Sequence, residues 1–452
     1  MEFNNKKILV VGFGRSGLST ARYLTGLGAE VTIGDIKPKA ELDKNLLKEV
    51  RDFGVKLEAG EHRMATFLNS DMIIVSPGVP MNIKPLLAAR NAGVPVSGEL
   101  GIASTLFDTP VLAVTGTNGK TTTVSLLEEI IKRSGRPLFT GGNIGTPLME
   151  YLSGGMKAEY VLAEVSSFQL DTAEYFSPFV SLILNITPDH LDRYESFDAY
   201  ARSKYSITKN QGKGQYTVLN DDDPLLHRFK PEGEVSVIRY GMENAEGRSA
   251  YIEGKRLIAC VPEKTEQLFS IDGFLPPGTH NLSNLMGAVL VALCAGIEAD
   301  FIQETIPDFK GLPHRIEHVA RVRGIDFYDD SKATNVDAAV KALEVFDRPV
   351  VLIAGGIHKG GDYDPLVRAS LKRVKNGVFI GEARFRLGDA FNKDIPYEFA
   401  EDMGDAVKKA FLSAAEGDVI LLAPACSSFD MFTDYGHRGR VFKEKVEGLN
   451  NG

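Results

Sequence analysis

The sequence predicts an α/β protein of three domains, each built around a mostly parallel β-sheet. The chain has 452 residues, and because domains average about 150 residues, the length favours three of them. Short apolar runs alternate with helix-like stretches along the chain, which is the pattern of parallel sheets with helical crossovers. We place the three domains at residues 1–98, 99–311 and 312–452.

The first segment has the pattern of a dinucleotide-binding, Rossmann-like domain. Strands are predicted at Lys7–Val11, Glu30–Ile33 and Asp71–Val75. The glycine turn Gly12-Phe-Gly-Arg-Ser-Gly17 joins the first strand to a helix-like stretch, and Asp35 follows the second strand. Such a turn lets a diphosphate approach the helix N-terminus, although close packing of helix on strand also explains the glycines. The third strand leads into Ser76-Pro77-Gly78, a turn by composition.

The second segment opens with a phosphate-binding loop. The apolar strand Val111–Val114 runs into Thr115-Gly-Thr-Asn-Gly-Lys-Thr121 and then into a helix. The loop amides can point into one cavity, while Lys120 adds a positive charge and Thr121 offers a hydroxyl to Mg²⁺. The spacing departs from the full Walker pattern, because Val114 stands where that pattern has a glycine. A kinase or GTPase is therefore disfavoured.

Polar residues follow the later strands of this segment. Those strands are predicted at Tyr160–Val165, Val180–Leu184 and Tyr216–Leu219. Glu164, at the carboxyl end of its strand, suits a magnesium ligand, with a surface acid as the alternative. His190, in Asn185-Ile-Thr-Pro-Asp-His190, is a candidate metal ligand or a structural histidine. His280-Asn-Leu-Ser-Asn284 places two amides one helical turn apart, although Asn281 could instead cap a helix.

The third segment repeats the arrangement of strands followed by polar loops. Strands are predicted at Ile325–Tyr328, Val350–Ala354, Gly377–Ile380 and Val419–Leu422. The loops Asp329–Asn335, Gly355–Gly361 and Ala423–Asp430 follow three of these strands. In an open α/β sheet such loops form the ligand crevice. We expect the second and third loops to bind an anion through backbone amides and Lys359. The first loop gathers acids, hydroxyls and a base, and a solvated loop is the alternative for it.

Charge and cysteine content exclude several classes of protein. The net charge of −9 argues against a general nucleic-acid binder, which needs a clustered excess of Lys and Arg. The first apolar run is interrupted by Gly12 and is too short for a signal peptide or a membrane span. The three cysteines, Cys260, Cys294 and Cys426, are far apart and fit no metal site. We expect a cytoplasmic monomer that acts on small molecules, with no nucleic-acid partner and no membrane span.

With these motifs in order, the sequence resembles the Mur ligases of peptidoglycan synthesis. The matching motifs are Gly12–Ser19, Ser76–Gly78, Thr115–Thr122, Glu164–Gln169, Asp189–Tyr194, His280–Asn284, His314–Arg315, Asp330–Asn335 and Pro424–Asp430. The resemblance is closest to the branch that adds D-glutamate to UDP-N-acetylmuramoyl-L-alanine. It implies an N-terminal domain for the UDP end of the substrate, a central P-loop ATPase domain and a Rossmann-like C-terminal domain that closes over the site.

The resemblance also implies a role for each matching residue. The residues implied to contact ATP are Gly116, Thr117, Asn118, Gly119, Lys120, Thr121, Thr122, Asn281, Asn284, Arg315 and Asp330. Those implied to hold the UDP-linked substrate are Arg15, Ser16, Asp35, Lys37, Ser76, Pro77, Gly78, Asn143, Ser166 and Gln169. Those implied to hold D-glutamate are Lys332, Thr334, Lys359, Ser428 and Phe429. The stretch around Ser427 and Phe429 departs from the family, as does Tyr435, which stands where an apolar aromatic is often found.

Catalysis is implied to depend on two magnesium ions and a modified lysine. The catalytic residues are Lys120, Glu164, His190 and Lys204, and the ligands of the ions are Thr121, Glu164, His190 and Lys204. From its position alone, Lys204 is an ordinary solvated lysine of a helix. The family has a carbamylated lysine here, which turns an ammonium that would repel magnesium into an anionic oxygen ligand.

Three other functions compete with this one. The nearest is another ligase of the same group, such as the L-alanine-adding enzyme or folylpolyglutamate synthetase, whereas the Asp-Asn-Pro-Arg signature of the diaminopimelate- and lysine-adding ligases is absent. An NAD-dependent oxidoreductase would rest on Gly12–Gly17 with Asp35 and would leave the phosphate loop unexplained. A non-catalytic nucleotide-binding regulator would not need Glu164, His190 and Lys204 together.

Overall fold

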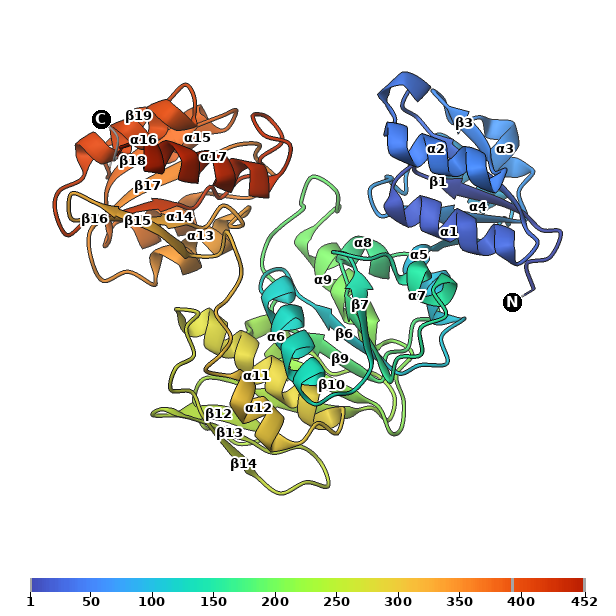
Figure 1. Ribbon diagram of the computed structural model, residues 1–452, viewed down its shortest axis with the longest axis horizontal. Helices are drawn as coiled ribbons and strands as arrows, with labels where there is room; N and C mark the ends of the chain where they lie inside the picture. The colour runs from blue at the N-terminus through green and yellow to red at the C-terminus, as the bar shows by residue number, and fades with distance from the viewer. Residues whose placement is uncertain (1, 392–393, 450–452) are drawn as a thin grey trace.

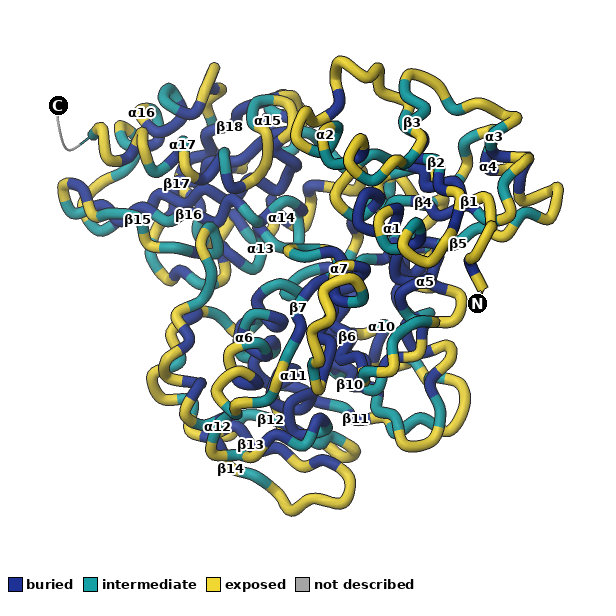
Figure 2. Tube along the Cα trace, turned by 45° about the vertical axis from the view of Figure 1, so that its right-hand side comes forward, coloured by how far each residue is buried: buried dark blue, intermediate teal, exposed yellow. Residues whose placement is uncertain are grey.

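The computed structural model describes residues 2–391 and 394–449 and confirms the predicted α/β class. Three β-sheets follow one another along the chain, and each lies in a lobe of its own (Figure 1). The buried residues gather on the strands of each lobe, while the connecting loops are mostly exposed (Figure 2). Each sheet therefore forms the buried centre of its lobe.

The N-terminal lobe is a five-stranded parallel sheet in the order β3-β2-β1-β4-β5. Its strands are β1 (Lys7–Val11), β2 (Glu30–Asp35), β3 (Lys56–Ala59), β4 (Met72–Val75) and β5 (Val96–Gly98). Its helices are α1 (Arg15–Gly26), η1 (Lys39–Glu41), α2 (Lys44–Phe53), α3 (Met64–Leu68) and α4 (Lys84–Asn91). Alternate residues of β1 point to opposite faces: Ile8 and Val10 pack towards α1 and α2, whereas Leu9 and Val11 pack towards α3 and α4. Helices thus cover both faces of the sheet.

The central lobe holds a nine-stranded sheet in the order β14-β13-β12-β11-β10-β9-β6-β8-β7. Its strands are β6 (Val111–Thr115), β7 (Leu138–Gly142), β8 (Tyr160–Glu164), β9 (Val180–Ile183), β10 (Tyr216–Asn220), β11 (Ser236–Tyr240), β12 (Ala250–Glu253), β13 (Arg256–Ala259) and β14 (Gln267–Ser270). Its helices are α5 (Glu99–Ser104), α6 (Lys120–Arg133), α7 (Leu148–Ser153), α8 (Ser167–Leu170), α9 (Phe197–Tyr205), η2 (Ser206–Thr208), α10 (Pro224–Arg228), α11 (Thr279–Cys294) and α12 (Ala299–Thr305). Every residue of β6 is buried, as expected for a central parallel strand.

The C-terminal lobe is a six-stranded sheet in the order β15-β16-β20-β17-β18-β19. Its strands are β15 (Glu317–Val322), β16 (Ile325–Asp329), β17 (Val350–Gly355), β18 (Val374–Ile380), β19 (Tyr397–Phe399) and β20 (Val419–Leu422). Its helices are α13 (Val336–Leu343), α14 (Asp364–Ser370), α15 (Arg384–Phe391), α16 (Met403–Ser413) and α17 (Tyr435–Gly448). The cores on the two faces of this sheet involve α13 to α15 on one side and α16 and α17 on the other.

The structure adds strands that the sequence patterns did not predict. β12, β13 and β14 form antiparallel pairs at one edge of the central sheet, and β15 pairs antiparallel with β16. β3, β5, β7, β11 and β19 extend the parallel parts. These are short or edge strands with mixed exposure, so their apolar signal is weak. All the strands that were predicted are present.

The first two lobes share one apolar core. Leu100, Ile102 and Ala103 of α5 belong to a buried cluster that includes residues of both sheets. Glu99, also on α5, accepts hydrogen bonds from Ser16 of α1 and from the Met149 backbone N–H. The predicted limits at residues 98 and 311 fall between successive sheets, and the exact domain boundaries stay a prediction.

The glycine turn after β1 is explained by packing. A Cβ added to Gly17, in the first turn of α1, would overlap the carbonyl oxygen of Gly12. Asp35 completes the turn, because its carboxylate accepts hydrogen bonds from the N–H groups of Phe13 at 2.7 Å and Lys37 at 2.8 Å. The structure therefore supports the packing explanation left open by the sequence.

Gly17→Ala is expected to destabilise the N-terminal lobe by about 1–3 kcal/mol, because the clash is with backbone that cannot turn aside. Gly26→Ala makes the same change at the end of the same helix, where an added Cβ meets nothing within 4 Å. That control should gain about 0.5–1 kcal/mol. Differential scanning calorimetry measures both, and equal melting of the two variants would contradict the packing explanation.

Candidate active site

The phosphate loop joins β6 to α6 and is fixed by its neighbours. The Thr117 N–H donates to the Asn185 carbonyl at 3.0 Å, and the Asn118 N–H donates to the Asn185 side chain at 2.8 Å. Gly119 has a φ of 87°, and a Cβ there would overlap the side chain of Asn284. The loop is therefore held in one conformation at the N-terminus of α6, where helix amides attract anions.

Lys120 folds back over this loop. Its Nζ donates to the carbonyl oxygens of Gly116 at 2.7 Å and Thr117 at 2.9 Å. Burial lowers the pKa of Lys120, while Glu164 and Asp189 oppose that shift. Two of the three N–H donors of this ammonium are used by the loop carbonyls. The third can donate to a phosphate oxygen bound by the amides of the same loop.

Glu164, at the end of β8, is a buried carboxylate with one free oxygen. Its side chain is 1% exposed, so the alternative of a surface acid is wrong. Its Oε1 accepts from Asn143 Nδ2 at 2.9 Å. Its Oε2 is buried and has no hydrogen-bond partner among the described residues. A buried unpaired carboxylate oxygen is costly, so the site suits a cation.

His190 and Asp189 lie beside each other after β9. Burial lowers the pKa of His190 to about 4, despite the opposing charge of Asp189. The imidazole is therefore neutral at pH 7, as a metal ligand must be. Asp189 is 8% exposed and accepts hydrogen bonds from Asn335 at 3.0 Å and from Lys359 at 3.5 Å. These partners belong to the C-terminal lobe.

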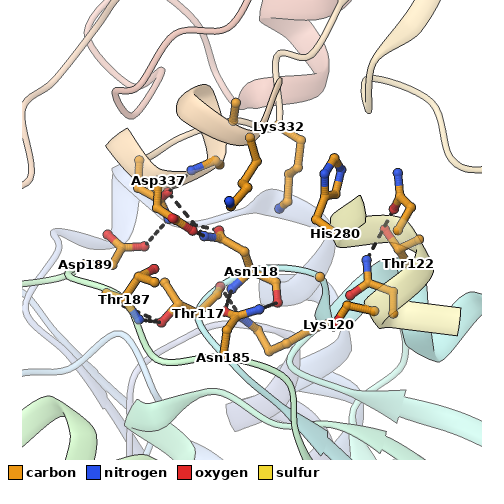
Figure 3. A pocket seen from close by; sticks show the side chains of 18 of the residues that line it. Thr117, Asn118, Lys120, Thr122, Asn185, Thr187, Asp189, His280, Lys332 and Asp337 are labelled. Atoms are coloured by element: carbon orange, nitrogen blue, oxygen red, sulfur yellow. Dashed lines mark hydrogen bonds between the residues drawn. The ribbon is translucent and has the colours of Figure 1, made fainter. Parts of the chain in front are cut away.

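The C-terminal lobe closes the other side of the site. The side chain of Asn118, at the tip of the phosphate loop, donates to Asp337 at 2.8 Å and accepts from Asn335 at 3.0 Å. Figure 3 shows Asp337 and Lys332 of this lobe facing Asn118 and Lys120 of the central lobe. The phosphate loop therefore contacts both lobes directly.

Cationic and acidic groups of the C-terminal lobe face this site. Burial raises the pKa of Asp330 to about 7, against the effect of Arg315. Burial also lowers the pKa of Lys332 to about 8, and its Nζ lies 3.9 Å from the ring centroid of Tyr435. The alternative of a solvated loop is wrong, because Asp329 and Ser331 are fully buried and Asp330 is nearly so.

One cavity of about 600 Å³ brings most of the predicted residues together. Those that line it are Thr117, Asn118, Gly119, Lys120, Thr121, Thr122, Asn143, Glu164, His190, Asn281, Asn284, Arg315, Asp330, Lys332, Thr334 and Lys359. Asn284 donates to Asn281 at 3.2 Å, so the two amides do share one face. Gly278 caps this helix, so the alternative of Asn281 as the cap is wrong.

Several residues that line the cavity have no recognisable signal in the sequence. They include Asn220, Asp222, Ser283, Asp337 and Lys341. Asp337 lies in the first turn of α13, where an acid is common because it favours the helix dipole. Its contact with Asn118 joins residues 219 positions apart, so no local pattern could have indicated it.

Three family models match the chain in order. They are described as the Mur ligase MurD-like N-terminal domain (residues 6–98), the Mur ligase middle domain (114–292) and the Mur ligase glutamate ligase domain (314–426). A protein of Geotalea uraniireducens named UDP-N-acetylmuramoylalanine–D-glutamate ligase is 41% identical over 452 residues, covering 100% of this chain and 99% of its own. A protein of the same name from Thermoanaerobacter sp. is 40% identical, over 99% of this chain and 100% of its own.

This chain belongs to the Mur ligase family. Its fold also matches that of a solved pseudomurein peptide ligase type C from Methanothermus fervidus, with a TM-score of 0.62 and 23% identity. The alignment covers 98% of this chain and 100% of that one. Among the described residues, no helix combines the length and apolar character needed to cross a membrane.

Lys204, the proposed modified lysine of this Mur ligase, is buried behind the phosphate loop. It lies on α9, its side chain is 1% exposed, and its Nζ donates to the Gly116 carbonyl at 2.9 Å. The Nζ also lies 4.7 Å from the ring centroid of Tyr200. Burial and then the charge of Lys120 lower the pKa of Lys204 well below its usual value. The interpretation as a solvated lysine is therefore wrong.

Apart from Lys204 and the residues predicted for the UDP end, the cavity lining lacks five predicted residues, Gly116, Ser166, Gln169, Ser428 and Phe429. Ser166 and Gln169 form a reciprocal capping box at the start of α8, which supports a turn-forming role. Ser428 is 3% exposed, whereas the side chain of Phe429 is 70% exposed. Their predicted contacts with substrates stay predictions.

The residues predicted for the UDP end lie at the carboxyl edge of the first sheet. Arg15 lines a separate cavity of about 560 Å³, together with Gly145, Thr146 and Pro147 of the central lobe. Ser16 bonds Glu99, and Asp35 accepts from backbone N–H groups, so these two side chains also stabilise the fold. The remaining predicted residues, Lys37, Ser76, Pro77 and Gly78, follow β2 and β4 at this edge.

A cluster of two acidic residues and a histidine lies outside the predicted site. His314, Glu317 and Asp329 have ligand atoms within 4.8 Å of one another. Lys443 pairs with Glu317 at 2.7 Å and lies 4.0 Å from Asp329. A lysine already supplies the cation for this group, so it is explained as an ion-pair network.

Proposed function

We propose that this Mur ligase uses ATP to join D-glutamate to UDP-N-acetylmuramoyl-L-alanine in peptidoglycan precursor synthesis. Two full-length relatives at about 40% identity carry the name of that reaction. The observation in the structure that supports it best is the single cavity in which the phosphate loop of one lobe faces the basic residues of another. A ligase needs this arrangement, because phosphorylation and amide formation occur at the same carboxyl group.

The donor set of the central lobe fits magnesium. Glu164 offers an unpaired buried oxygen, His190 is neutral at pH 7, and Thr121 lines the same cavity. We propose that these residues and a carbamylated Lys204 hold two ions. When bound, magnesium would offset the repulsion between the two anionic reactants and the charge that develops on the transferred phosphoryl group.

In the proposed reaction, an oxygen of the L-alanyl carboxylate attacks the γ-phosphorus of ATP, and ADP leaves. The loop amides and Lys120 stabilise the charge on the phosphoryl oxygens. The amine of D-glutamate then attacks the acyl carbon. The tetrahedral intermediate loses a proton and expels phosphate, which carries one oxygen of the original carboxylate.

The C-terminal lobe is proposed to receive D-glutamate. Lys332, Thr334 and Lys359 line the cavity opposite the phosphate loop, and Lys359 lies 3.4 Å from the Thr334 hydroxyl. Two lysines suit an amino acid that has two carboxylates. Contact between the lobes also keeps water from the acyl phosphate, which would otherwise hydrolyse.

We propose that one chain is sufficient and that it acts in the cytoplasm. Two lobes of this chain already supply one cavity with a phosphate loop, a buried carboxylate and two lysines, so the proposed reaction needs no residue from a second chain. ATP and a UDP-linked precursor are the reactants in this proposal, and both are small molecules of that compartment.

The direct test is mass spectrometry of the product formed from UDP-N-acetylmuramoyl-L-alanine, ATP and equal concentrations of D-glutamate, L-glutamate and L-alanine. We expect the D-glutamyl amide, with one ADP released per amide formed. Chiral analysis of the hydrolysed product separates the two glutamates. Lys120→Ala should abolish the reaction. Lys132 lies on the same helix with a side chain that is 63% exposed, so Lys132→Ala should retain activity. If the amino acid added to the substrate were only L-alanine or only L-glutamate, the proposed acceptor would be refuted.

A carbamate on Lys204 is proposed because the side chain is buried, reaches the phosphate loop and has a lowered pKa. An uncharged amine can attack CO₂, forming an N–C bond with loss of a proton, and the product is an anion. That anion would place an oxygen ligand beside Lys120 where the amine now lies.

Lys204→Ala should reduce activity by about 10- to 100-fold, with partial recovery when small carboxylic acids are added. Exposed Lys209, just beyond the same helix, provides the matched control, Lys209→Ala. A carbamate resonance should appear in the ¹³C NMR spectrum of the wild type supplied with ¹³C-bicarbonate and be missing from Lys204→Ala. Full activity of the unrescued variant would remove the carbamate from the mechanism.

A further inference from the structure

Arg438 is a fully buried arginine that the proposed mechanism does not use. It lies on α17, has an exposed fraction of 0%, and is the largest of the fully buried side chains. Within residues 2–391 and 394–449, no carboxylate lies close enough to form an ion pair with it. A guanidinium in such a position must find its partners among uncharged groups, or burial would be very costly.

Its partners are one hydroxyl and three backbone carbonyls. Nε donates to Ser331 Oγ at 3.0 Å, and Nη2 donates to the Ser331 carbonyl at 2.8 Å. Nη1 donates to the carbonyls of Cys426 at 3.1 Å and Gly355 at 3.4 Å. The Ser331 hydroxyl in turn donates to the Tyr435 carbonyl at 2.8 Å, on the same helix as Arg438.

These carbonyls belong to the three loops that follow neighbouring strands of the C-terminal sheet. Ser331 follows β16, Gly355 ends β17, and Cys426 follows β20, which pairs with both of the other strands. The same loops carry the residues predicted to hold D-glutamate, which are Lys332, Thr334, Lys359, Ser428 and Phe429. One side chain therefore connects every segment of the predicted acceptor site.

We propose that Arg438 is a positioning residue that sets the spacing of the three acceptor loops, and so determines the affinity for the amino acid. The assignment of that amino acid as D-glutamate rests on the proposed function. Arginine suits the role because its planar fork donates several hydrogen bonds in fixed directions. Lysine would carry the same charge from a single point and could not reach all three loops.

The structural part of the proposal is tested without substrates, by hydrogen exchange of Arg438→Lys and the wild type. We expect amide exchange in residues 330–335, 355–359 and 425–429 to be about tenfold faster in the variant, with no change at β6 and β8. Arg440→Lys, an exposed arginine on the same helix, should change none of these segments. Unchanged exchange in the three loops of Arg438→Lys would overturn the proposal, whatever reaction the protein catalyses.

The functional part is tested by separating the kinetic constants. Arg438→Lys should raise the KM for D-glutamate about tenfold and leave the KM values for ATP and the UDP-linked substrate nearly unchanged. A merely structural defect would instead lower kcat with the folded fraction and leave every KM as it was. That result would also overturn the proposal.

Ser331→Ala keeps the proposal testable if Arg438→Lys does not fold. It removes only the hydroxyl between Arg438 and the Tyr435 carbonyl. We expect the KM for D-glutamate to rise about threefold, with faster exchange in residues 330–335. An unaltered KM and unaltered exchange in a folded Ser331→Ala protein would contradict the role. Absence of any D-glutamate ligation by the wild type, in contrast, would refute the proposed function and leave the exchange experiment to decide on Arg438.

Discussion

The interaction on which the site depends is the contact of Asn118 with the C-terminal lobe. The phosphate loop is fixed from below by Asn185, and its one projecting amide bonds both Asp337 and Asn335. Two sheets thereby present their carboxyl ends to the same cavity (Figure 3). In the proposed reaction, ATP and the amino-acid acceptor are then both held within reach of the same carboxyl group. An acyl phosphate has a short lifetime, so the amine must already be close when it forms.

The cavity also concentrates charge in a small volume. Lys120, Lys332 and Lys359 face Glu164 and Asp189. Burial lowers the pKa values of Lys120 and Lys332, whereas burial of Asp189 is outweighed by the charge of Lys359 together with the hydrogen bonds that Asp189 accepts, and the pKa of that carboxyl is lowered. Such an arrangement is costly when the cavity holds only water, because buried charges lose hydration. Polyanionic substrates and a divalent cation would offset that cost, so binding and contact between the lobes should favour each other.

The sequence could predict what depends on local patterns. The strands β1, β6 and β16, the phosphate loop and Glu164 were all recognisable from short apolar runs and the residues that follow them. The burial of Lys204, the contact of Asp337 with Asn118 and the three-loop contacts of Arg438 were not. All three depend on contacts between distant parts of the chain or of the fold, and Lys, Asp and Arg are usually solvated. The antiparallel strands β12 to β14 were missed for another reason, since short edge strands carry little apolar signal.

The central claim is that one carboxylate is phosphorylated by ATP and then attacked by an amine within the same cavity. UDP-N-acetylmuramoyl-L-alanine labelled with ¹⁸O in its alanyl carboxylate tests this directly. After one turnover with ATP and D-glutamate, we expect one ¹⁸O atom in inorganic phosphate, found by mass spectrometry, for each amide formed. Unlabelled phosphate, with the displaced ¹⁸O atom found in water or in AMP, would contradict the account.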